Sequence, residues 1–196
     1  MIVARPASIV RAGEEVSTAA ALAHNRVKIS MSIASPETFE GADVVLASPD
    51  LAFVGTGLRT SPRAAEAVKL ALANEGFAEV HIVQTTYGCG HLDGVLSVLG
   101  GRHALVYPKR TPYVCVEALN RHGFKVLELP DANEATHGMA INIVPINEET
   151  VLLPAGNPRT TNLLERLGLQ CLSTEMSELM KMGGAVHCVT GVIARG

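Results

Sequence analysis

The sequence has few aromatic residues and no excess of basic charge. Phe, Trp and Tyr make up 4% of its 196 residues, tryptophan is absent, and 16 Lys and Arg stand against 19 Asp and Glu, a formal net charge of −3. Domains that bind nucleic acid usually carry clustered basic residues, often with aromatic stacking platforms. The composition therefore argues against nucleic acid as a partner.

Long apolar runs are also missing. No run approaches the roughly 20 residues that a membrane-spanning helix needs. The first residues, MIVARPASIVRAGEE, lack the basic start, long apolar stretch and cleavage site of a signal peptide. We therefore expect a cytoplasmic protein without a membrane partner.

Cysteine is sparse and scattered. The four cysteines lie far apart and include no C-x-x-C pair; they are Cys89, Cys115, Cys171 and Cys188. This spacing predicts neither a disulfide framework nor a zinc site. We expect four free thiols and no bound metal.

Apolar residues are plentiful: hydrophobic residues make up 47% of the chain. A chain of this length and composition can bury one substantial core, and we predict a single domain over residues 1–196.

The chain repeats a pattern of two apolar strands, a helix and a third strand. The paired strands are expected in ADVVLASPDLAFVGTG, LDGVLSVLGGRHALVYP and AINIVPINEETVLLPAG, the helices in SPRAAEAVKLALANEG, TPYVCVEALNRHG and NPRTTNLLERLG, and the last strands in VHIVQ, KVLEL and QCLST. The unit recurs about every fifty residues, which is typical of a circular or stacked array of modules. Asp43, Asp93 and Asn142 occupy equivalent places at the head of the first strand of each copy.

The copies at the two ends are incomplete. Residues 2 to 5 are expected to form the second strand of a hairpin whose first strand is missing, followed by a helix over about 13 to 25 and a strand in VKISMSI. At the other end, GGAVHCVTGVIARG is expected to supply strand material, with residues 186 to 193 as a candidate partner of residues 2 to 5.

Four short stretches carry the candidate chemistry: EGAD at 40–43, GLRTS at 57–61, GHLDG at 90–94 and GGAVHC at 183–188. Each has an ordinary structural explanation, since a buried cysteine, a loop histidine, a surface arginine and turn-forming carboxylates are all common. Together they supply a nucleophile, a proton-transfer group, carboxylates and an arginine suited to a carboxylate, the components of a covalent hydrolase.

The ordered set of motifs resembles the guanidine-modifying, or pentein, superfamily. FEGADVVLASPDLAFVGTGLRTSPRAAEAV resembles its E/D-G-G-D and R-T-N/S segments, HLDG its histidine-x-aspartate motif, and GGAVHCVT its cysteine segment, while LLPAGNPRT and GMAIN are similar to its dimethylarginine dimethylaminohydrolase, arginine deiminase and arginine dihydrolase branches. The resemblance implies an α/β fold, a five-bladed propeller of ββαβ modules with an incomplete first blade.

The resemblance also implies roles for individual residues. Cys188 would be the nucleophile, His91 the general acid and base, and Glu40 the carboxylate that holds both the guanidinium and the histidine. Asp93, with Asp43 as a further candidate, would hold the other guanidinium nitrogens, and Arg59 would bind the α-carboxylate of an arginine-like substrate. His187 is expected to be structural, because adjacent residues of a strand face opposite ways.

The implied activity is hydrolysis of arginine or a methylated arginine through a thiouronium on Cys188, giving citrulline or ornithine without a cofactor. An amidinotransferase with an amine acceptor, and a non-catalytic protein that only binds ligand, stay open as alternatives. The family's N-terminal segment, with a further aspartate, has no counterpart in the chain, so truncation and weak substrate binding are expected. An open sheet edge at an incomplete ring would allow a homo-oligomer.

Overall fold

The structure, a computed structural model, describes residues 1–192, which fall into two compact units. Unit 1 comprises Met1–Leu92 and Arg110–Cys115, and unit 2 comprises Asp93–Lys109 and Val116–Gly196 up to the last described residue. The expectation of one domain over 1–196 stays a prediction.

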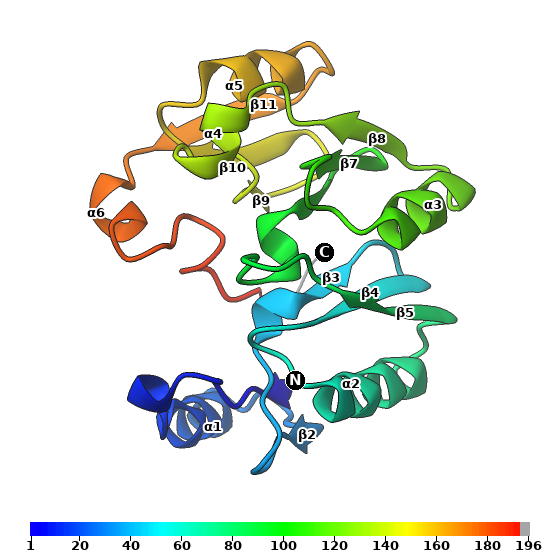
Figure 1. The fold of residues 1–196 in the computed structure, drawn as a ribbon, viewed down its shortest axis with the longest axis vertical. Helices are drawn as coiled ribbons and strands as arrows, with labels where there is room; N and C mark the ends of the chain where they lie inside the picture. The colour runs from blue at the N-terminus through cyan, green and yellow to red at the C-terminus, as the bar shows by residue number, and fades with distance from the viewer. Residues whose placement is uncertain (193–196) are drawn as a thin grey trace. The chain divides into compact units, whose positions relative to one another are not determined.

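Unit 1 holds a two-stranded and a three-stranded sheet (Figure 1). Its strands and helices are β1 (Ile2–Val3), η1 (Ile9–Arg11), α1 (Glu14–His24), β2 (Met31–Ser32), η2 (Gly41–Asp43), β3 (Val44–Leu46), β4 (Leu51–Thr56), α2 (Pro62–Asn74) and β5 (Glu79–Gln84). β1 pairs in parallel with β2, β3 with β4 in antiparallel, and β4 with β5 in parallel. The helix α2 contacts β4 and β5 and covers their sheet.

Unit 2 holds two three-stranded sheets, ordered β6-β7-β8 and β9-β10-β11. Its elements are β6 (Leu96–Leu99), β7 (His103–Val106), β8 (Lys125–Glu128), α4 (Ala132–Thr136), β9 (Val144–Pro145), β10 (Thr150–Pro154), α5 (Pro158–Glu165), β11 (Gln170–Thr174) and α6 (Ser177–Met180). Two further elements, η3 (Leu92–Gly94) and α3 (Tyr113–Arg121), contain residues of both units.

The strand, strand, helix, strand repeat is confirmed in three copies. In each, the central strand pairs in antiparallel with the strand before it and in parallel with the strand after the helix. The glycine after each helix has a positive φ, at Gly76, Gly123 and Gly168, as a left-handed helix end requires. The strands form separate mixed sheets within the described chain.

Each unit has an apolar core made by these repeats. In unit 1, Phe39 and Val54 pack with Ala64, Ala65 and Val68 of α2. In unit 2 the buried set comes from the two sheets, α5 and the segments beside them: Leu99, Leu105, Leu129, Ile141, Ile143, Val151, Leu153, Leu164 and Leu169, with Ala140. Among residues 1–192, no helix combines the length and apolar character needed to cross a membrane.

The two ends depart from the expected strands. The N-terminal strand ends at Val3, and Arg5 makes only an isolated bridge with Phe39. The prediction of strand structure after Gly183 is wrong for the described part: residues 186–189 form a turn and 190–192 are irregular, while residue 193 lies outside the described residues. Gly183 has a φ of +78°, a left-handed conformation incompatible with an extended strand.

Candidate functional site

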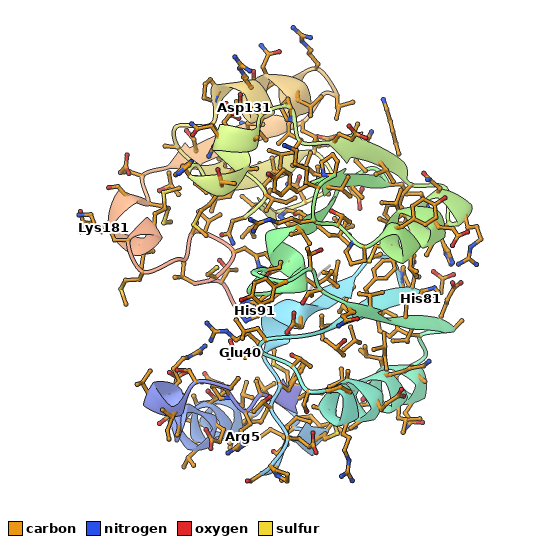
Figure 2. All side chains as sticks on the ribbon, in the orientation of Figure 1. Arg5, Glu40, His81, His91, Asp131 and Lys181 are labelled. Carbon is orange, nitrogen blue, oxygen red and sulfur yellow. The ribbon has the colours of Figure 1, made fainter. Side chains whose placement is uncertain are left out.

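The Glu40 carboxylate gathers four hydrogen-bond donors in unit 1. Its Oε2 lies 2.8 Å from His91 Nε2 and 3.1 Å from Arg11 Nη1, and its Oε1 accepts from the Ala7 N–H at 3.1 Å and from Arg59 Nη1 at 3.3 Å. Figure 2 labels Glu40 and His91. The Glu40 side chain is only 6% exposed, so this carboxylate is buried among its donors.

The neighbours of Glu40 in sequence hold it in place. Phe39 is buried in the core and its N–H donates to the Arg5 carbonyl oxygen. The N–H of Glu40 itself donates to Thr60 Oγ1. η2 begins at the next residue, so the backbone of Glu40 is fixed on both sides.

The environment of Glu40 favours its ionised form. Burial raises the pKa of its carboxyl, but the hydrogen bonds from His91 and the Ala7 N–H, with the charges of His91 and Arg59, lower it more, and the pKa is below its ordinary value of 4.5. An ionised carboxylate only accepts hydrogen bonds. His91 Nε2 therefore carries the proton that lies between the ring and Glu40.

The Glu40 carboxylate already binds two guanidinium groups of its own chain. Arg59 comes from the GLRTS loop, and Arg11 from η1, where it also pairs with Glu14 at 2.7 Å. The hydrogen bond with Glu14 raises the pKa of Arg11, and the charge and hydrogen bond of Glu40 raise it further. Together they outweigh burial, which lowers this pKa. The sequence predicted Arg59 near the site but gave no signal for Arg11, whose contact depends on the path of the chain after β1.

Both carboxylate oxygens of Asp43 accept hydrogen bonds within unit 1. It is 2% exposed, its Oδ2 accepts from Thr60 Oγ1 at 2.6 Å, and its Oδ1 accepts from the Leu92 N–H at 3.0 Å. This last bond fixes the backbone directly after His91. Asp43 therefore orders the histidine segment, whatever further part it plays in binding.

The strand expected from Leu92 and Asp93 onward begins later than predicted, and His91 and Asp93 do not share a strand. Asp93 lies in η3, His91 directly precedes it, and β6 begins only at Leu96. The tight turn allows the Leu92 N–H to reach the Asp43 carboxylate, a partner that a strand ladder would not provide.

In unit 2, Cys188 lies in the turn 186–189 and is exposed. Its Sγ accepts from Asn142 Nδ2 at 3.2 Å, and the neighbouring His187 N–H donates to Asn142 Oδ1 at 2.8 Å. The His187 ring lies with Nδ1 3.0 Å from Asp93 Oδ2. The prediction that His187 is structural relied on a strand, and these residues form a turn instead. His187 and Asn142 both contact residues of the candidate site.

The structure thus groups the predicted site residues within the units. Unit 1 brings together Glu40, His91 and Arg59, with Asp43 behind the histidine segment. Unit 2 links Asp93 to the turn of Cys188 through His187. Among the residues described, no cluster of three or more His, Cys, Asp or Glu side chains could hold a metal ion.

The chain is similar to known proteins in sequence and in fold. No protein-family model matches the chain. An uncharacterised protein of Aeropyrum pernix is 29% identical over 196 residues, covering 96% of this chain and 65% of its own, and the dimethylarginine dimethylaminohydrolase of Pseudomonas aeruginosa is 25% identical over 162 residues, covering 81% and 57%. The chain therefore spans about half to two thirds of the length of these relatives.

Solved structures share the fold. The Pseudomonas aeruginosa dimethylarginine dimethylaminohydrolase, a cysteine-to-serine mutant complexed with citrulline, matches with a TM-score of 0.76 at 25% identity, over 93% of this chain and 67% of its own. The resemblance of the chain to the guanidine-modifying, or pentein, superfamily is confirmed. An amidinotransferase of the saxitoxin pathway from Microseira wollei has the same fold, with a TM-score of 0.85 at 18% identity, over 99% of this chain and 66% of its own.

Proposed function

We propose that this pentein hydrolyses the guanidinium group of arginine or a methylated arginine. The observation that best supports the proposal is the Glu40 carboxylate, which is buried and holds two guanidinium groups of its own chain beside His91. A site that binds Arg11 and Arg59 in this way offers the same charge-assisted hydrogen bonds to a substrate guanidinium.

The proposed chemistry follows from the properties of a guanidinium. It is planar and a poor electrophile, so carboxylates must grip its N–H groups and fix its central carbon for attack. Glu40, with Asp93 and Asp43 as further carboxylates, would hold these nitrogens. The Cys188 thiolate would add to the central carbon, and His91 would protonate the departing amine or ammonia.

The resulting thiouronium on Cys188 would then be hydrolysed. His91 takes a proton from water as the water oxygen bonds to the same carbon, and the C–S bond breaks to return the thiolate. This sequence releases citrulline. Hydrolysis of the bond between Nδ and the ureido carbon of citrulline would give ornithine, with the carbon leaving as carbamate, which decomposes to carbon dioxide and ammonia. The mechanism requires Cys188 and His91 to act on one substrate, within the five-bladed propeller that we propose for the whole protein.

Arg59 is proposed to bind the substrate's α-carboxylate. Arg59 Nη1 donates to Glu40 Oε1. The Arg59 side chain is 32% exposed, and its other N–H groups have no partner among residues 1–192. Agmatine lacks this carboxylate. Wild-type protein should therefore prefer arginine to agmatine, and Arg59→Ala should remove most of that preference.

The test is an end-point assay with mass detection. The protein is incubated with arginine, methylated arginines and agmatine, and scored for citrulline, ornithine, ammonia and methylamines. Cys188→Ser should abolish turnover, whereas the control Cys171→Ser should retain it. Product from Cys188→Ser at the wild-type rate would overturn the mechanism.

Two further outcomes decide the alternatives. Amidino transfer that appears only when glycine or another amine acceptor is added would identify an amidinotransferase, which shares the thiouronium intermediate. Binding of arginine by calorimetry, without product and without any covalent mass on Cys188, would identify a non-catalytic protein.

A further inference from the structure

Asn142 lies between the core of unit 2 and the turn that carries Cys188. It is 4% exposed and follows Ile141, a buried core residue. Its side-chain amide makes two contacts with the turn: Oδ1 accepts from the His187 N–H at 2.8 Å, and Nδ2 lies 3.2 Å from Cys188 Sγ. One buried side chain thus holds two successive residues of an exposed turn.

The contact with His187 decides which way the amide of Asn142 points. Oxygen and nitrogen of an amide are assigned from their partners. A backbone N–H can only donate, so the atom facing His187 must be Oδ1. The group facing Cys188 Sγ is therefore an N–H donor, the kind of group that can hydrogen-bond an anionic sulfur.

We propose that Asn142 is the positioning residue for Cys188, fixing its turn through Oδ1 and stabilising its thiolate through Nδ2. This inference rests on the proposed function in treating Cys188 as the nucleophile. Asn142 does not itself touch a reacting carbon in the proposal. It acts through the sulfur.

The surroundings of Cys188 support a fixed turn. A Cβ at Gly184 would lie 3.3 Å from Cys188 Cβ, so a side chain at position 184 would crowd the cysteine. His187, within this turn, pairs with Asp93 at 3.0 Å. Among residues 1–192, Asn142 is the side chain that donates to the Cys188 sulfur.

The equivalent residue of an earlier copy of the repeat shows what the amide at position 142 adds. Asp43, the equivalent residue of an earlier copy, accepts the Leu92 N–H and so fixes the segment of His91. Asn142 accepts the His187 N–H in the same manner. An aspartate at 142 could accept that N–H equally well, but its second oxygen would face the Cys188 sulfur and repel a thiolate.

Asn142→Asp is therefore the decisive variant, because it keeps the shape and the acceptor but replaces the donor with a carboxylate oxygen. The assay follows alkylation of Cys188 by iodoacetamide, a neutral reagent, across pH 5 to 10 without substrate, with each cysteine resolved by mass spectrometry. We expect alkylation of Cys188 at pH 7 to slow by at least about tenfold and its pH midpoint to rise. Asn142→Ala should slow it less, because the donor is lost but no charge is added.

Asn162→Asp, on an exposed residue of α5, is the matched control for the added charge and should leave the Cys188 profile unchanged. An unchanged profile in a folded Asn142→Asp protein would overturn the inference. If that variant does not fold, Asn142→Ala decides alone, and a wild-type midpoint there overturns it. Since no substrate is used, a shifted profile in a protein inactive on every guanidine would sustain the inference and refute the proposed function.

Discussion

Replacing Glu40 with glutamine should destabilise the protein in a way that depends on pH. Glutamine can still accept from the Ala7 N–H and from Arg59 through its oxygen. Its amide group would take the place of Oε2, where it would face two donors, His91 Nε2 and Arg11 Nη1. The variant therefore loses charge-assisted hydrogen bonds at a carboxylate that is only 6% exposed.

The size of the effect follows from that loss. A hydrogen bond to a charged group contributes about 1.5–3 kcal/mol to the free energy of unfolding. For a chain of this length, each kcal/mol shifts Tm by about 2–4 °C. We expect Glu40→Gln to lower Tm at pH 7 by about 3–12 °C, measured by circular dichroism.

The pH dependence has a definite sign. The pKa of Glu40 is lowered in the folded protein from its ordinary value of 4.5, so the folded state binds the proton less tightly than the unfolded state. The ionised carboxylate stabilises the fold above that value, and the contribution is lost as pH falls through the lowered pKa. Glutamine does not titrate, so the Tm difference between the two proteins should shrink below about pH 4.5.

Glu14→Gln is the control, because it also removes a carboxylate from Arg11, but an exposed one. Exposed ion pairs contribute little, and its Tm should stay close to wild type. A Glu40→Gln protein that melts with the wild type at pH 7, or a gap that persists unchanged in acid, would refute the reasoning.

Three further predictions follow from other contacts. Glu134→Ala should lower Tm by about 2–12 °C, since its carboxylate caps α5 with three bonds, and the two donors of the buried Thr160 would lose their partner; an unchanged melt contradicts this. Arg11→Ala should tighten arginine binding about twofold to fivefold in calorimetry by freeing Glu40; weaker binding contradicts it. A haloacetamidine should label Cys188 first and Cys115 last, because burial raises the pKa of Cys115 to about 12; equal labelling contradicts it.

The labelling experiment needs one control that only the structure reveals. Cys188 is the exposed cysteine, while Cys89 and Cys115 are buried and Cys171 is half-buried. Exposure alone would therefore favour Cys188 with any reagent. Only a preference larger than that of neutral iodoacetamide reports carboxylates that attract a cation.

The sequence by itself determined the repeat and the position of most candidate residues. Alternating apolar runs, Pro at helix starts and Gly at helix ends are local signals, so the strands around α2 and α5, and their pairing as modules, followed from them. The contact of Glu40 with His91 was expected through the resemblance to penteins, and in the structure His91 Nε2 lies 2.8 Å from Glu40 Oε2.

Only the tertiary structure decided how the side chains are held. Arg11 and Glu40 are 29 positions apart in the sequence, and Asn142 and Cys188 are 46 apart. Local sequence patterns do not predict side-chain contacts over such separations. His91 lies in an irregular segment, Asp93 in η3 and Cys188 in a turn, and the N–H groups of neighbouring residues there bond to the buried side chains of Asp43 and Asn142. Those bonds depend on packing between distant segments, which local propensity does not encode.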